Sequence, residues 1–272
     1  MPILGAYVVP HPPMLITEVG GGSEIQIIET LVGCTRVAKE ISELRPDTII
    51  FISPHSPLYS DRFYVSTGEI AKGSFAKFGA PRVRFNEHCD TELAEEIITE
   101  AEKLNVPVDP DGVNSELDHG IMVPLRFIKS QYNDAKIVRL GISGLSFEEH
   151  FRFGQAIRSA VEALDRRVVF VASGDLSHKL KDYGPYGVSP EGIDYEEKII
   201  KVFDDNDLQM LMEFDPEYLE KAAVCGHKAF ITMSGLIDGL GFESTFVSHD
   251  DITGVGYGVC LFYPSSSRNT NE

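Results

Sequence analysis

Short runs of apolar and β-branched residues recur along this chain, and longer segments between them carry apolar residues every three or four positions. Nearly every residue within the short runs is apolar, which is typical of strands that are covered on both faces of a sheet. We therefore predict six strands, over residues 3–9, 48–53, 136–141, 167–172, 244–248 and 256–263.

The segments between the strands carry helix signals. Ser23 with Gln26, and Ser146 with Glu149, have the spacing of a capping box, in which a serine and a Glu or Gln satisfy the backbone where a helix begins. We predict helices over residues 24–44 and after Ser146, an amphipathic helix over residues 93–104, and a more apolar helix over residues 229–240.

Strands that alternate with helices of this length predict an α/β fold, a three-layer α/β/α sandwich with a central mixed, mostly parallel sheet. We expect one domain over residues 1–264 and a disordered polar tail over residues 265–272. Residues 179–194 are rich in Gly, Pro, Asp and Tyr, which predicts a long loop with a functional role.

Composition narrows the classes of partner. The 272 residues are 43% hydrophobic and 24% charged, which is ordinary for a globular protein, and the formal net charge is −18. This charge argues against nucleic acid and against an anionic membrane surface. The four cysteines lie far apart and the N-terminus lacks a basic leader, so we expect a cytoplasmic protein. A homodimer is expected only as the commonest state of soluble enzymes.

Three histidines follow predicted strands at equivalent positions. His11 follows the first strand, His55 the second and His178 the fourth, and prolines or a Gly-Asp turn stiffen each site. Ligands of α/β sheets gather at the carboxyl ends of the strands, and imidazole suits iron, zinc and copper. The sequence thus predicts a metal site with coordination positions left open for water, O2 or substrate.

Two further segments are candidates. Asp118 precedes an apolar run, where it has the position of a helix cap, and the adjacent His119 is a candidate contact for substrate or oxygen. Cys225 and His227 lie just before the helix predicted from residue 229, where a cysteine can have a lowered pKa and bind metal. A buried, inert cysteine is the competing interpretation.

In order along residues 3 to 263, the motifs Pro10-His11-Pro12-Pro13, Ser53-Pro54-His55, Asp118-His119-Gly120 and Ser173-Gly174-Asp175-Leu176-Ser177-His178 resemble the class III extradiol dioxygenases, the LigB-like superfamily. The resemblance implies a LigB-like fold, His11 and His55 as ligands of a non-haem Fe(II), His178 as acid/base and His119 facing substrate or oxygen. It also implies a reaction that inserts both atoms of O2 into a small aromatic ring beside two hydroxyls.

The third ligand departs from the ring-cleaving members, which place a glutamate near the start of a late helix. Here no glutamate lies between Glu220 and Glu243, and the Cys225-Gly226 step resembles the Memo branch, in which a cysteine takes that position. We expect Cys225 as the third ligand, with His227 as the alternative. Fe(II) is the expected metal, with Zn or Cu as alternatives. The Memo resemblance further implies a radical-SAM partner protein.

Three functions compete. The first is an extradiol-type dioxygenase on a catechol-like substrate, with Tyr183, Tyr186 or Tyr195 stacking on its ring. The second is a zinc hydrolase with Asp175 or His178 as base. The third is a Memo-like redox-metal-binding accessory or interaction protein without turnover. We interpret residues 249–251 as a solvated turn, and His88 and His150 as surface residues.

Overall fold

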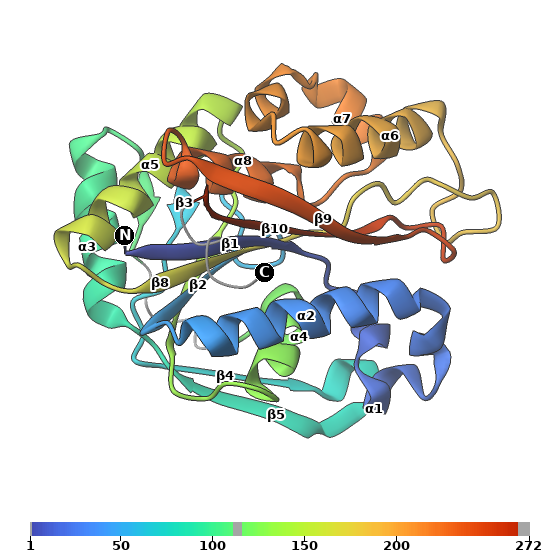
Figure 1. Cartoon of the computed structure of the whole chain (residues 1–272), viewed down its shortest axis with the longest axis horizontal. Helices are drawn as coiled ribbons and strands as arrows, with labels where there is room; N and C mark the ends of the chain where they lie inside the picture. The colour runs from blue at the N-terminus through green and yellow to red at the C-terminus, as the bar shows by residue number, and fades with distance from the viewer. Residues whose placement is uncertain (1, 111–115, 266–272) are drawn as a thin grey trace.

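A central sheet of six strands runs through the molecule (Figure 1). In the computed structural model, which describes residues 2–110 and 116–265, the strand order is β7-β2-β8-β1-β10-β9. The first four strands pair in parallel, and β10 and β9 complete the sheet antiparallel. The predicted mixed, mostly parallel sheet is confirmed. The six strands are β1 (Ile3–Val9), β2 (Thr48–Ser53), β7 (Lys136–Gly141), β8 (Val168–Ser173), β9 (Phe242–Asp250) and β10 (Tyr257–Pro264).

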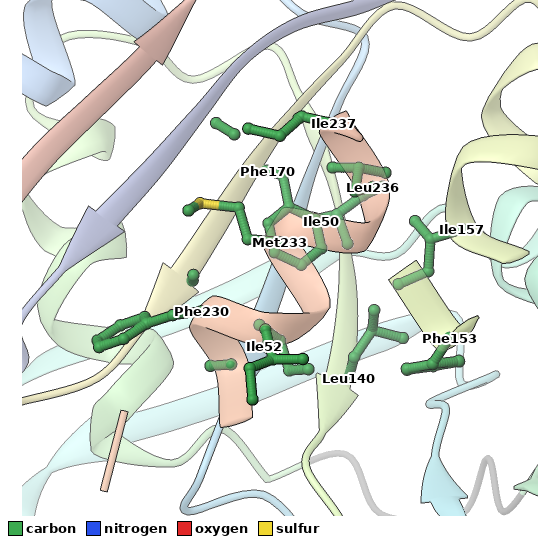
Figure 2. Packing of buried hydrophobic residues seen from close by; sticks show 14 of the residues in the cluster. Ile50, Ile52, Leu140, Phe153, Ile157, Phe170, Phe230, Met233, Leu236 and Ile237 are labelled. Atoms are coloured by element: carbon green, nitrogen blue, oxygen red, sulfur yellow. The ribbon is translucent and has the colours of Figure 1, made fainter. Parts of the chain in front are cut away.

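Helices cover both faces of this sheet, because alternate side chains of its buried strands enter two separate cores. Ile50 and Ile52 of β2 pack in one core, whereas Ile49 and Phe51 pack in the other. Figure 2 shows the first core, in which side chains of α8 and α5 lie over the sheet. This is the predicted three-layer α/β/α sandwich. The first face carries α3 (Thr91–Lys103), α5 (Phe147–Ala163), α6 (Pro190–Asp204), α7 (Pro216–Ala222) and α8 (His227–Ile237), and the second carries α2 (Ile28–Leu44) and α4 (His119–Lys129).

Smaller elements complete the described chain. A hairpin missed by the sequence patterns packs beside α4 and consists of β4 (Ile70–Phe75) and β5 (Ala80–His88), while β3 (Phe63–Tyr64) pairs with β6 (Val108–Asp109). The remaining short helices are α1 (Thr17–Gly20) and the 3-10 segments η1 (Pro13–Leu15), η2 (Ser23–Ile27), η3 (Ala76–Phe78) and η4 (Leu208–Glu213).

Several predicted boundaries are wrong for local reasons. Ser23 forms no capping box: its hydroxyl donates to the Gly20 carbonyl, residues 23–27 form a 3-10 turn, and α2 begins only at Ile28. The capping box at Ser146 is confirmed. The predicted loop over residues 179–194 ends early, because Ser189 caps α6 and Pro190 occupies its first turn.

The proposed division into a domain over residues 1–264 and a tail stays a prediction, and residues 266–272 of that tail lie outside the described residues. Within the described residues, every helix is too short or too polar to cross a membrane.

Candidate metal centre

Three neighbouring parallel strands bring their carboxyl ends to the same edge of the sheet. β2 pairs with β8 and β8 pairs with β1, so the residues just past them converge. His11, His55 and Asp175 each lie two residues beyond one of these strands. The parallel pairing thus explains why residues more than a hundred positions apart meet at one site.

His11 is held in a defined orientation. Its backbone N–H donates to Oδ1 of Asp175 over 2.8 Å, and its Nδ1 lies 2.9 Å from the Ser173 hydroxyl. That hydroxyl donates its own proton to the Gly120 carbonyl, so it accepts from Nδ1–H of His11. This assigns the proton to Nδ1 and leaves the Nε2 lone pair directed at the site.

The Nε2 atoms of His11 and His55 face each other over 3.1 Å. Two imidazoles about 2.1 Å from one metal, at angles of 90–109°, place their nitrogens about 3.0–3.4 Å apart. Burial, followed by the neighbouring His55, lowers the pKa of His11 to about 3, so it is neutral near pH 7. Spacing and protonation therefore both fit a first-row metal ion.

His119 completes a group with His11 and His55 whose ligand nitrogens all lie within 4.8 Å of one another. Burial and the two other histidines lower the pKa of His119 to about 3. Its ring centroid lies 4.0 Å from that of His55 and 5.4 Å from that of Phe78. His55, His119 and Phe78 line a cavity of about 350 Å³, and Met122 and Lys77 also form part of its wall.

Cys225 approaches the same site from the turn before α8. Its Sγ lies 3.8 Å from Nε2 of His11 and accepts the Asp175 backbone N–H over 3.2 Å. Gly174 and Gly226 allow the two backbone segments to approach each other this closely, because a Cβ on Gly174 would lie 2.2 Å from the Gly226 Cα. Burial raises the pKa of the Cys225 thiol well above its usual range, so binding of a cation would have to displace the thiol proton.

The donors form two groups that share His11. One is His11, His55 and His119, and the other is His11, Asp175 and Cys225, each with ligand atoms within 4.8 Å. Among the described residues, no such group contains both His55 and Cys225. The two sets of donors therefore share only His11.

Asp175 and His178 form a second titratable pair beside the donors. Their Oδ2 and Nε2 atoms are 4.0 Å apart. Burial raises the pKa of Asp175 to about 6, and the nearby His178 partly offsets this rise. Nδ1 of His178 is buried and has no hydrogen-bond partner among the described residues, while the ring lies edge-on to Tyr186 at 5.2 Å. His178 thus presents Nε2 to Asp175, while its Nδ1 is buried without a partner among the described residues.

Several sequence candidates lie elsewhere. Both ring nitrogens of His227 are occupied, by the Tyr195 hydroxyl at 3.1 Å and the Leu211 carbonyl at 2.9 Å, which leaves no lone pair for a metal. Tyr195 is fully buried, so the expectation that it stacks on a substrate is wrong. His150 is also fully buried, contrary to its interpretation as a surface residue, whereas His88 is exposed. His249 pairs with Glu196 over 2.7 Å.

Sequence reasoning missed the residues that orient the donors. Ser173 was visible within a motif but was given no role. Asp118 caps α4 as predicted, and it also accepts the hydroxyls of Ser53 at 2.7 Å and Ser56 at 2.8 Å, which flank His55. Serine next to a candidate ligand at a strand end is the signal that could have identified these contacts.

Comparison with known families decides what kind of site this is. Residues 5–260 match the family described as the catalytic LigB subunit of aromatic ring-opening dioxygenase. The chain belongs to the LigB family. This membership confirms the resemblance seen in the motifs.

Relatives divide between two branches of the LigB family. Protein CA_C1420 of Clostridium acetobutylicum is 34% identical over 95% of this chain, which spans only 57% of that protein. A 3,4-dihydroxyphenylacetate 2,3-dioxygenase of Escherichia coli is 24% identical over 80% of this chain and 83% of its own length. A MEMO1 family protein of Thermococcus onnurineus is 34% identical over 46% of this chain and 43% of its own length. The chain is thus similar to both dioxygenases and Memo-like proteins.

The fold itself is shared with a solved structure. Uncharacterized protein JW3007 from Escherichia coli K12 matches with a TM-score of 0.64 at 16% identity, over 95% of this chain and 99% of the other. At this identity the match extends to the fold alone.

Proposed function

We propose that this chain is an iron-dependent, extradiol-type dioxygenase that acts on a small catechol-like substrate with O2. The observation that carries the proposal is the pair of Nε2 atoms of His11 and His55, which face each other over 3.1 Å at the strand ends of a LigB-family fold. The similarity to a 3,4-dihydroxyphenylacetate dioxygenase supports the substrate class.

In this proposal His11, His55 and Cys225 hold the iron. When bound there, iron would supply a Lewis acid that polarises the hydroxyl oxygens of a catechol and takes part in its reaction with O2. The alternative donor set replaces Cys225 with His119. Ser173 keeps the Nδ1 proton on His11, so that its Nε2 remains a donor.

The other residues bind substrate and move protons. His119 and Phe78 form one wall of the cavity of about 350 Å³, against which an aromatic ring can lie. His178 accepts the proton of a substrate hydroxyl at Nε2, the nitrogen that faces Asp175, and returns it later in the reaction. Asp175, whose Oδ2 lies 4.0 Å from Nε2 of His178, stabilises the protonated imidazole.

The deciding experiment is elemental analysis of protein purified without oxygen, for the wild type and His11→Ala, His55→Ala, Cys225→Ala and His119→Ala. We expect near-stoichiometric iron that is lost in the first three variants and kept in the fourth. His88→Ala, which removes an exposed histidine of β5, is the matched control. Iron kept in Cys225→Ala but lost in His119→Ala would assign the all-histidine set instead.

Activity is then measured as O2 uptake with catechol and 3,4-dihydroxyphenylacetate. Uptake by the wild type and its loss in His178→Ala support the dioxygenase. Zinc in place of iron would favour the hydrolase, and metal that survives in His11→Ala, His55→Ala and Cys225→Ala would refute the site.

A Memo-like redox-metal-binding role is the second candidate, and the cysteine in place of a carboxylate favours it. A thiolate donates more charge to a metal than a carboxylate and is itself open to oxidation. A filled iron or copper site with no O2 uptake on any catechol would support this role, in which a radical-SAM enzyme is the proposed partner. Co-purification with such an enzyme would then be the test.

A further inference from the structure

A second cavity is lined by Cys225 and His227 and contains none of His11, His55 and His119 in its wall. It measures about 330 Å³, which lies within the range of about 300–1,000 Å³ found for small-molecule sites. Most of its wall is apolar. The apolar lining comes from Leu58, from Ile142 and Phe147 beside the start of α5, and from Leu219 and Val224 of α7 and the turn after it.

This cavity is separate from the one beside His55 and His119. Residues 55–58 contribute to both: His55, Ser56 and Pro57 line the first cavity, and Leu58 lines the second. Cys225 joins the second cavity to the candidate metal centre. A molecule bound in this cavity would therefore contact the Cys225 thiol, with His227 also in the wall, and not the rings of His55 and His119.

One cation lines this apolar cavity. Lys228, on the first turn of α8, is only half exposed, and its Nζ donates to the carbonyls of Ser143 at 2.8 Å and Leu145 at 3.3 Å. Among the described residues, no carboxylate lies within 4.0 Å of this ammonium. By contrast, Lys77 in the first cavity is 82% exposed and pairs with Glu116 over 3.1 Å.

An ammonium removed from water is stabilised when an anion joins it, and two carbonyls use only two of its three protons. Burial also lowers the pKa of Lys228, which indicates that its charge is poorly solvated. The exposed Glu220 at the same cavity disfavours a ligand with several negative charges. The lining therefore favours a small apolar molecule that carries a single anionic group.

We propose that this cavity binds a small aryl monocarboxylate, with its ring between Phe147 and Leu219 and its carboxylate on the Lys228 ammonium. Lys228 is then a specificity-determining residue that selects acids over neutral analogues. Binding requires no turnover and no hydroxyl on the ring, so it succeeds or fails independently of the proposed dioxygenase reaction.

The test is calorimetric titration of the purified full chain with phenylacetate and with phenylacetamide, its neutral analogue. We expect the wild type to prefer the acid. We expect Lys228→Met, which keeps the apolar stem, to weaken phenylacetate binding about tenfold or more and to leave phenylacetamide unchanged. Lys228→Arg keeps the charge and should restore the preference. Lys77→Met is the matched control, with unchanged binding of both probes.

A second pair of variants leaves intact the hydrogen bonds that Lys228 donates to the Ser143 and Leu145 carbonyls. Leu58 is 61% exposed, so Leu58→Glu and Leu58→Gln should both fold, which thermal unfolding checks. Leu58→Glu should bind phenylacetate more weakly than Leu58→Gln. Equal affinity for the two probes in the wild type would overturn the proposal. So would a loss of binding in Lys77→Met but not in Lys228→Met, which would place the acid in the first cavity.

Discussion

The two sides of the candidate metal centre are built in different ways. The strand-end half, consisting of His11, His55 and Asp175, follows three paired parallel strands. The turn half, residues 223–226, is held by the Gly174–Gly226 contact and by the hydrogen bond from the Asp175 N–H to Cys225. The sheet fixes the positions of His11, His55 and Asp175, whereas a short turn positions Cys225, the proposed third ligand. Changes to the two halves should therefore have different effects.

Ser173→Ala should have the largest effect, because it removes the hydroxyl that fixes the proton on Nδ1 of His11. Loss of such an outer contact typically costs 10–100-fold in metal affinity. We expect a decrease of about this size in iron affinity, measured by competition with a chelator. Ser159→Ala on α5 is the control, since its hydroxyl bonds only within the helix. Unchanged affinity in Ser173→Ala would refute the assigned role of this serine.

The turn before α5, which His150 supports, should affect stability, and the size of this effect should depend on pH. His150 accepts the Ser143 N–H at Nε2 and donates from Nδ1 to the Ser146 carbonyl, and burial lowers its pKa from 6.5 to about 3. Below pH 6.5 the unfolded chain binds a proton that the folded chain does not, so stability present above pH 6.5 is lost as the pH falls toward 3.

Between pH 7 and pH 5 this loss amounts to about 2 kcal/mol for one histidine. We expect the difference in unfolding free energy between wild type and His150→Gln to narrow by about this amount over that range, measured by urea denaturation. A constant difference would show that His150 has the same pKa in the folded and the unfolded chain, and would contradict the lowering of its pKa by burial.

Ala223→Gly should have the smallest effect, and it should stabilise the folded chain where the changes above weaken metal binding or stability. Ala223 ends α7 with φ of 53°, a left-handed conformation that costs a residue with a Cβ about 1 kcal/mol. We expect glycine to raise the unfolding free energy by about this amount. The neighbouring Ala222→Gly, inside the helix, should lower it by about 1 kcal/mol. Destabilisation in both variants would show that the turn half does not bear this strain.

The sequence predicted the strand-end half better than the turn half, for physical reasons. His11, His55 and His178 follow apolar runs that predict buried strands, and parallel pairing of such strands would bring the residues after them to one edge of the sheet. Cys225 and His227 could not be separated in this way. His227 is excluded as a donor by the Tyr195 hydroxyl and the Leu211 carbonyl, which come from α6 and η4. These are tertiary contacts that no local pattern reports.

Helix starts show the same limit. Ser146 and Ser23 carry the same signature, but only Ser146 caps a helix. Ser23 follows Gly21 and Gly22, both in the left-handed region, and its hydroxyl bonds backward to Gly20. A capping residue begins a helix when its own backbone is extended, as at Ser146. The capping motif alone does not specify that backbone conformation.

The position of β1 also bears on how the protein is made. This first strand lies between β8 and β10, with Ala6 opposite both Phe170 and Phe262. Its two neighbours are therefore synthesised long after it, and loops of this length slow the folding search. His11, which directly follows β1, takes its position only once those partners have emerged from the ribosome. A metal ion held by His11, as proposed, should thus load after synthesis is nearly finished, and a chain stalled before β8 should not retain it.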